Sequence, residues 1–422
     1  MSSLPEQSEF STHAVPSNAR VASFRVAAVA SMVSFSLPTF IVGIEVSSGV
    51  GADLALAAIL GGALVIFLIG WLMGSIGTRT GFNSYLLVRL AFGDAGARIV
   101  NLVFSISLLG WFGINLNLFG LAVAGLAKEL FGVIPPELFI TIIASLFITV
   151  TTIIGFRAIN LVSMLMIPVL AFVAVALLLT TISHSVPVVV VSQVDLSLGD
   201  GISAIVGSIV IGSIIMPDIT RFLRTSGGAL LTSGTSYMIA QPFVMWVAAN
   251  AAMILGADDI ISIMLTLGLG IGAFSIIIAG SWVLNALNLY SAVLGVTASF
   301  PGLSARAVTV VLGVIGVTAG LMNILDSFVT FLLYLSIVFI PVAGVIIIDH
   351  FIARPEVYRV TQVEDNQPLN RYGLLAWFAG AAIALATSEG FVGSVTSVAA
   401  LDAMLTAAVL YWMAARLGWV RQ

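Results

Sequence analysis

The sequence predicts an all-α polytopic membrane protein with 12 transmembrane helices, arranged as two five-helix halves of opposite orientation and two further C-terminal helices. Three observations predict it. Of the 422 residues, 60 % are hydrophobic and only 8 % are charged, whereas a soluble domain carries roughly 25 % charged residues. The apolar residues form stretches near the about 20 residues that a helix needs to span a bilayer. The basic residues collect on alternate connections between these stretches.

Short polar connections separate the twelve expected spans. The spans are 26–47, 54–76, 97–125, 137–155, 159–182, 202–220, 229–254, 270–297, 305–324, 328–348, 373–389 and 395–415. With this assignment every arginine lies on one side of the membrane, and Lys128 alone lies on the other. Basic residues are retained on the cytoplasmic side. We therefore expect both termini to be cytoplasmic and the protein to lie in the plasma (inner) membrane.

Four segments follow from the spans. The polar segment 1–25 lacks the basic start and short apolar core of a cleaved signal peptide, so we expect a mobile cytoplasmic tail. The first five-helix repeat is expected at 26–182 and the second at 183–348, and 349–422 holds a charged cytoplasmic loop and helices 11 and 12. The absence of cysteine excludes disulfides and thiolate metal sites. A net charge of −4 without a basic cluster does not indicate a nucleic-acid partner.

The first span is interrupted at Ser36-Leu37-Pro38. Proline removes a backbone donor and clashes with the preceding turn. The freed carbonyls are tolerated in a membrane only where they line a cavity or are buried in protein. A break with a functional role is therefore expected here.

Connections outside the spans carry their own predictions. Residues 77–93, GTRTGFNSYLLVRLAFG, are too polar for lipid and are expected at the cytoplasmic surface as a short helix from Asn83. The outer loop 183–201 contains a β-like patch at Val186–Val191, and 258–268 is expected to form an amphipathic outer helix.

The sixth span carries glycine–serine pairs at 207–208 and 212–213, which predict loose points in its middle. Five spans precede the 183–201 loop and five follow it, so the two halves enter the membrane from opposite sides. Interruptions in the first helix of each half predict an inverted-repeat transporter with its site near the middle of the membrane.

Three charged residues are candidates for coupling or gating. Glu45 follows the break in the first span, and a carboxylate within a span marks a functional candidate unless it lies at the outer boundary in contact with water. Asp218 and Arg221 are three residues apart at the cytoplasmic end of the sixth span, so they can pair. They either hold an intracellular gate or anchor the helix at the interface.

Ser107–Asn117, SLLGWFGINLN, places Trp111 and Asn115 one turn apart on one helix face. A flat π-surface beside an amide suits a flat, polar, heteroaromatic ligand. Alternatively, Trp111 fills space and Asn115 bonds a neighbouring helix. The eighth span adds Asn285 and Asn288, and amides within the membrane favour a polar cavity over bonds between helices.

These stretches resemble the nucleobase:cation symporter family 1, which comprises the cytosine, purine, hydantoin and allantoin permeases. The resemblance rests on GTRTGFNSYLLVRLAFG, on GWFG in the third span, on PDITRF in the sixth, on NALNLYSAVLG in the eighth and on IPVAGVIIIDHF at the end of the tenth. It implies the leucine-transporter-type 5+5 inverted repeat with two extra helices, working by alternating access.

The resemblance also implies roles for individual residues. Trp111 stands where the family has its substrate-stacking tryptophan, and Asn115 stands where hydantoin-type members have a glutamine. Asn285 and Asn288 match the amides that bind substrate. The backbone around Ser36 matches the unwound part of the first helix.

Three positions depart from the bacterial cytosine permeases. Leu108 stands in place of a glutamine, and Ile209 and Ile211 stand where the sixth helix has an aromatic residue that closes the sandwich and a nearby serine. The sequence therefore predicts import of a nucleobase or related planar heterocycle, purine- or cytosine-like, without identifying cytosine. Hydantoin, allantoin or a vitamin precursor such as pyridoxine are the alternatives.

The coupling ion is expected to be a proton. Sodium-coupled members have hydroxyl side chains near Asn285, where this sequence has Val283 and Leu284. Aliphatic side chains offer no oxygen ligand, so Glu45 or Asp218 becomes the expected proton carrier. Sodium remains the alternative, and no other cofactor is expected.

A secondary transporter is favoured over two other classes of membrane protein. A channel would show rings of polar residues or a filter repeat, and the sequence has neither. An enzyme would need a nucleophile–base pair or a metal constellation, whereas His13, His184 and His350 all lie outside the expected spans. The expected partners are a small heterocyclic substrate and the lipid bilayer, and the expected functional unit is a monomer.

Overall fold

The computed structural model describes residues 13–154, 156–183, 196–256, 260–270, 280–300, 302–321, 328–359 and 367–420. In these ranges the chain is mainly helical, and an isolated parallel β-bridge joins Val21 and Leu223. Among the same residues, five helices are long and apolar enough to cross a membrane, and a pair of helices bent by 56° adds a sixth when it is counted as one span. The all-α membrane class is confirmed, and the number of twelve spans stays a prediction.

The helices of the first half follow one another with short connections. They are η2 (Ser17–Ala19), α1 (Ser23–Met32), η3 (Val33–Phe35), α2 (Leu37–Val50), α3 (Ala52–Thr80), α4 (Ser84–Phe131), α5 (Glu137–Ile154) and α6 (Phe156–Ser183).

The rest of the described chain is helical in the same way. Its elements are α7 (Leu198–Ile214), α8 (Pro217–Thr220), α9 (Gly227–Ser233), the π-helix η4 (Gly234–Ala240), α10 (Gln241–Leu255), α11 (Ile260–Thr266), α13 (Ser281–Ser299), α14 (Ala305–Gly320), α15 (Phe328–Ile348), η7 (Asp349–Ala353), η8 (Pro355–Arg359), α16 (Arg371–Ser388) and α17 (Ala399–Arg416).

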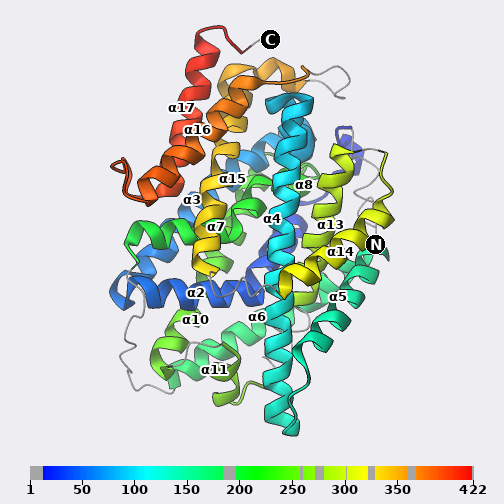
Figure 1. Ribbon diagram of the computed structural model, residues 1–422, viewed down its shortest axis with the longest axis vertical. Helices are drawn as coiled ribbons and strands as arrows, with labels where there is room; N and C mark the ends of the chain where they lie inside the picture. The colour runs from blue at the N-terminus through cyan, green and yellow to red at the C-terminus, as the bar shows by residue number, and fades with distance from the viewer. Residues whose placement is uncertain are drawn as a thin grey trace.

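Helix α4 forms the long axis of the molecule and runs through most of its length (Figure 1). Helix α13 packs along α4, and α7 lies between α3 and α15. Helices α16 and α17 pack on each other and α17 packs on α15, at the end where the chain finishes (Figure 1). The elements that line the central cavity are α1, η3, α2, α4, α7, α8, η4, α10 and α13, and the last two helices lie outside them.

The first span is broken where Pro38 predicts. Helix η3 ends at Phe35, Ser36 is extended with φ −89° and ψ 154°, and α2 begins at Leu37. Proline is tolerated in the first turn of α2 because that turn has no use for its missing N–H. The break leaves backbone polar groups without helical partners in the middle of the molecule.

The sixth span is broken at 215–216, later than the sequence predicts. Helix α7 runs without interruption past Gly207 to Ile214, and α8 begins at Pro217. The predicted loose points are therefore wrong. A Cβ at Gly207 would overlap the carbonyl oxygen of Leu332, so this glycine lets α7 and α15 approach closely instead of bending α7.

The short helix predicted from Asn83 is confirmed. The Asn83 side chain accepts a hydrogen bond from the Leu86 amide at 2.9 Å, which caps the first turn. Gly93, with φ 76° and ψ 172°, then separates residues 84–92 from the rest of α4. A Cβ there would lie 2.8 Å from the Gln367 carbonyl oxygen, so both conformation and space call for glycine.

The segment before α1 is packed, so the prediction of a mobile tail is wrong for its described part. The Val15 amide donates to the Gly81 carbonyl at 3.0 Å. The Arg20 guanidinium donates to the carbonyls of Thr78 at 2.9 Å and Leu223 at 3.3 Å. This segment therefore ties the end of α3 to the chain that follows α8. The first 12 residues lie outside the described part.

Two predictions concern the outer connections. Helix α11 covers Ile260–Thr266 and confirms a short helix within 258–268. The β-like patch at Val186–Val191 lies outside the described residues.

A buried ion pair fixes α15 to its neighbours. The Arg354 Nε donates to Asp349 Oδ1 at 2.8 Å, and the hydroxyls of Tyr358 and Tyr411 donate to the same carboxylate at 2.7 and 2.8 Å. Arg354 also donates to the Leu90 carbonyl at 2.9 Å. Burial and the Asp349 charge raise the pKa of the Tyr358 phenol, so it stays a donor. The cluster joins α15, α17 and the start of α4 at what we call the basic end of the molecule, where the Arg20 segment also lies.

Candidate binding cavity

A cavity of about 230 Å³ lies at the centre of the helix packing. Five parts of the chain line it: the broken first span, α4, the broken span α7–α8, the segment η4–α10, and α13. Its volume is near the lower end of pockets that enclose a small organic molecule. A cavity bounded by both broken spans is where the sequence places the site.

Five of the predicted site residues line this cavity. They are Ser36, Trp111, Ile209, Asp218 and Asn288. They come from four separate spans, and the cavity brings four predicted substrate-binding residues together with Asp218, a coupling or gate candidate.

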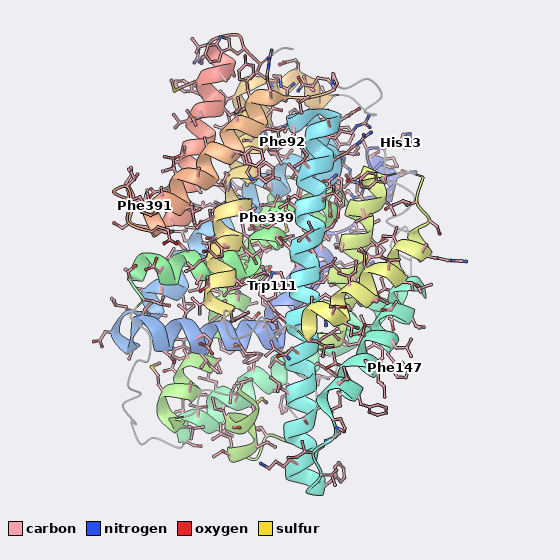
Figure 2. All side chains as sticks on the ribbon, viewed as in Figure 1. His13, Phe92, Trp111, Phe147, Phe339 and Phe391 are labelled. Atoms are coloured by element: carbon pink, nitrogen blue, oxygen red, sulfur yellow. The ribbon has the colours of Figure 1, made fainter. Side chains whose placement is uncertain are left out.

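Trp111 is held in place by two aromatic rings. It lies on the middle stretch of α4, near the centre of the molecule (Figure 2). The Phe328 and Phe331 rings meet it edge to face, with centroids 6.0 and 5.6 Å from the indole and interplanar angles of 85° and 76°. Gly110 leaves room for Phe331, because a Cβ there would lie 3.2 Å from that ring. The indole is therefore oriented before any ligand arrives.

Asn115 does not line the cavity. It is fully buried, and its Nδ2 donates to the Trp111 carbonyl at 2.8 Å, one turn back along α4. Its amide oxygen has no hydrogen-bond partner among the described residues. Asn115 thus braces the helix beneath Trp111, and its contact with a ligand stays a prediction.

Asn285 is also outside the cavity lining. It is fully buried in α13, and neither atom of its amide has a partner among the described residues. The Ser281 hydroxyl, one turn earlier, is also buried and also has no hydrogen-bond partner among the described residues. Unpaired buried polar groups cost about 1–3 kcal/mol each. Only Asn288 of the three predicted amides lines the cavity.

The Asp218 carboxylate joins the sixth span to the start of α4. Its Oδ1 accepts hydrogen bonds from the Ser84 amide at 2.7 Å and the Ser84 hydroxyl at 2.8 Å. The N-terminus of a helix favours a negative charge. The Arg221 Nε donates to the Asp218 main-chain carbonyl at 3.2 Å, so the two residues that the sequence predicts to pair are in contact.

Glu45 and Arg221 stand apart from the cavity wall. Glu45 is exposed on α2 and does not line the cavity. Arg221 is 3 % exposed and its guanidinium lies 4.9 Å from the Phe222 ring centroid. Of the two predicted proton carriers, Asp218 is therefore the one at the cavity.

Tyr237 and Gln241 are cavity residues that the sequence did not predict. They belong to η4 and the start of α10, within the seventh span, and their side chains are 3 % and 1 % exposed. The available signal was a glutamine inside an apolar run, since a polar side chain within a span marks a functional candidate.

Comparison with protein families gives a match over nearly the whole chain. The family model described as permease for cytosine/purines, uracil, thiamine and allantoin matches residues 14–414. The cytosine permease of Escherichia coli strain K12 is 26 % identical over 359 residues, which cover 83 % of each chain. The cytosine permease of Escherichia coli O157:H7 matches equally, at 26 % over 359 residues and 83 % of each chain.

Solved transporter structures share the fold. Mhp1, a nucleobase-cation-symport-1 family transporter in a closed conformation with bromovinylhydantoin bound, is 19 % identical with a TM-score of 0.79, over 96 % of this chain and 95 % of that one. The inward-facing conformation of Mhp1 is 18 % identical with a TM-score of 0.81, over 96 % of this chain and 93 % of that one. A Na⁺-coupled sialic acid symporter in a substrate-bound outward-open state is 13 % identical with a TM-score of 0.67, over 94 % of this chain and 90 % of that one. The predicted transporter fold is confirmed.

Proposed function

Because the chain belongs to the family of permeases for cytosine/purines, uracil, thiamine and allantoin, we propose that it is a symporter that imports a planar nitrogen heterocycle of the nucleobase type. The protein is a multi-pass membrane transporter and not an enzyme. The observation that carries the proposal is the restrained indole of Trp111 in a cavity that both broken spans border.

The cavity supports stacking and hydrogen bonding of one flat ligand. Stacking on Trp111 contributes about 0.5–1.5 kcal/mol beyond the buried area. Asn288 adds donors and acceptors, and the extended backbone at Ser36 adds polar groups freed by the break. This combination fits a nucleobase-like ring.

Apolar residues narrow the choice of substrate. Leu108 and Ile209 both line the cavity, at positions where the bacterial cytosine permeases carry a glutamine and an aromatic residue. Fewer polar groups in this part of the wall favour a purine, hydantoin or allantoin over cytosine. Such a substrate would be captured from outside and released at the basic end, which positive-inside topology makes cytoplasmic together with both termini. The membrane is the plasma membrane in this proposal.

Proton coupling is the first candidate for the driving ion. Val283 and Leu284 line the cavity on α13 and provide no oxygen ligand, whereas hard cations need oxygen ligands. The Asp218 carboxyl lines the same cavity and is able to bind and release a proton.

Sodium coupling is the second candidate, and one observation favours it. The buried oxygens of Ser281 and Asn285 lack partners among the described residues. Gly280 lies close to the broken first span, because a Cβ there would be 3.5 Å from the Phe35 carbonyl oxygen. Together these oxygens could complete a site for a small cation or for water.

Uptake into proteoliposomes tests substrate and ion together. Radiolabelled hypoxanthine, adenine, uracil, cytosine, hydantoin and allantoin are offered with an inward proton gradient or an inward sodium gradient. We expect one or more of these heterocycles to accumulate with the proton gradient, to be lost on addition of a protonophore, and to be indifferent to replacing sodium by choline. Accumulation that requires the sodium gradient would show that sodium, and not the proton, is the coupling ion. Uptake and binding of none would refute the proposed substrate class.

A further inference from the structure

The seventh span contains a π-helix that faces the cavity. Helix η4 covers Gly234–Ala240 and continues directly into α10. The π-helix is rare and is found mostly at functional sites. Two hydrogen bonds pin it to the first span, from the Ser236 hydroxyl to the Ala30 carbonyl at 3.0 Å and from the Ser34 hydroxyl to the Ser236 carbonyl at 3.3 Å. Its side chains are therefore fixed relative to the break in that span.

Gln241 brings an unsatisfied amide to the cavity wall. The side chain is 1 % exposed and lines the cavity, and its Oε1 has no hydrogen-bond partner among the described residues. Buried side-chain polar atoms in proteins are nearly always paired with protein, water or ligand. An amide offers both an acceptor oxygen and N–H donors on one planar group.

Tyr237 stands one turn before Gln241 and is held from two sides. A Cβ at Gly70 of α3 would lie 2.6 Å from the Tyr237 ring, and a Cβ at Gly212 of α7 would lie 3.5 Å from its hydroxyl. The two glycines thus leave the ring and hydroxyl in place at the cavity wall. Tyr237 and Gln241 form one polar strip on the seventh span.

We propose that Gln241, supported by Tyr237, determines which heterocycle the cavity accepts by pairing with an edge that carries an N–H donor beside an acceptor. The amide of Gln241 accepts from that N–H and donates to the adjacent carbonyl or ring nitrogen, as an amide pairs with a base edge. The lactam edges of hypoxanthine, uracil and hydantoin have this arrangement. The inference rests on the proposed function, since it assigns recognition within the same cavity.

N-methylation of the ligand isolates this pairing. The affinities of hypoxanthine and 1-methylhypoxanthine, of uracil and 3-methyluracil, and of hydantoin and 3-methylhydantoin are measured with purified protein. One ligand pair will be bound most tightly by the wild type. Within that pair, we expect the affinity for the unmethylated member to exceed that for the methylated member by about tenfold or more. In Gln241→Leu this ratio should fall to near one, because the methyl group no longer displaces a hydrogen bond.

A second variant reverses the edge that is preferred. Gln241→Glu presents two acceptors, so affinity should shift toward guanine, which carries adjacent N–H donors. This gain of binding is also observable if Gln241→Leu fails to fold. Asn250→Leu is the matched control in α10, because Asn250 bonds the Trp246 carbonyl and does not line the cavity. It should keep the wild-type ratio.

The outcomes distinguish a failure of the role assigned to Gln241 from a failure of the proposed function. Wild-type discrimination in Gln241→Leu, or no shift toward guanine in Gln241→Glu, would overturn the assignment of Gln241 while Trp111→Ala still loses binding. If Trp111→Ala binds like the wild type, or the wild type binds none of these ligands, the proposed function itself fails.

Discussion

At the scale of single residues, the orientation of Trp111 matters as much as its presence. Two phenylalanine rings hold the indole before a ligand arrives, so little ordering is left for binding to oppose. We predict that Trp111→Ala weakens heterocycle binding by about tenfold or more, because stacking and buried area are both lost. Trp111→Phe should retain part of the affinity. Equilibrium binding of the transported heterocycle measures both.

Trp282 provides the matched control for this substitution. It lies on α13 beside the Phe147 ring, at 6.0 Å between centroids, and it does not line the cavity. Trp282→Ala should bind like the wild type. Unchanged affinity in Trp111→Ala would mean that the ligand binds elsewhere.

Residue spacing predicts part of the site. It does not predict the direction of a side chain that can form alternative hydrogen bonds. The position of Trp111 follows from its sequence context, but Asn115 turns back to the Trp111 carbonyl, an option open to Asn that spacing does not reveal. Gln241 was missed for a different reason. The π-helix before it changes the angle per residue, so the α-helical period no longer tells which side chains face inward.

At the scale of helices, glycines set how closely spans approach. We predict that Gly207→Ala destabilises the protein by about 1–3 kcal/mol, the usual cost of overpacking. The added Cβ would overlap the Leu332 carbonyl, and rotation of a side chain cannot relieve a clash with backbone. The thermal unfolding midpoint in detergent reports the effect.

Gly125→Ala is the comparison for this prediction. Gly125 lies on α4, and a Cβ placed there would meet no heavy atom within 4 Å among the described residues beyond its chain neighbours and its own helix backbone. Its midpoint should stay at or slightly above that of the wild type, because alanine favours the helix. Equal midpoints for Gly207→Ala and Gly125→Ala would show that α7 and α15 tolerate separation.

The two breaks show what sequence tells about helices. Pro38 predicts the first break because it lacks an N–H donor and its ring clashes with the preceding turn, and Ser36, just before α2, is extended. The second break was misplaced because glycine has two uses, bending a helix and admitting a neighbour. Only the position of α15 decides that Gly207 serves the second use.

At the scale of the whole molecule, the cavity is connected to the basic end through the sixth span. Asp218 lines the cavity and bonds the first residue of α4, while Arg20 ties the end of α3 to the chain after α8. Hydrophobic spans and basic connections predict a multi-pass membrane protein and its topology from sequence, and the interrupted helices together with the family resemblance predict a transporter. They do not predict that the opening segment packs, because its contacts join residues far apart in the chain, such as Val15 and Gly81.

The last prediction concerns how this connection couples transport to an ion. If the Asp218 carboxyl carries the proton, Asp218→Asn removes the titratable group but keeps an oxygen that accepts from Ser84. We expect this variant to exchange heterocycle across proteoliposomes while failing to accumulate it on an inward proton gradient. In the wild type, a pH difference of one unit across the membrane supplies about 1.4 kcal/mol per proton, which corresponds to about tenfold accumulation of the heterocycle.

Glu45→Gln is the control, since Glu45 is exposed on α2 and outside the cavity lining. It should still accumulate substrate as the wild type does. Accumulation by Asp218→Asn on a proton gradient would exclude Asp218 as the carrier. Loss of accumulation in Glu45→Gln alone would instead identify Glu45, which follows the break in the first span, as the proton carrier.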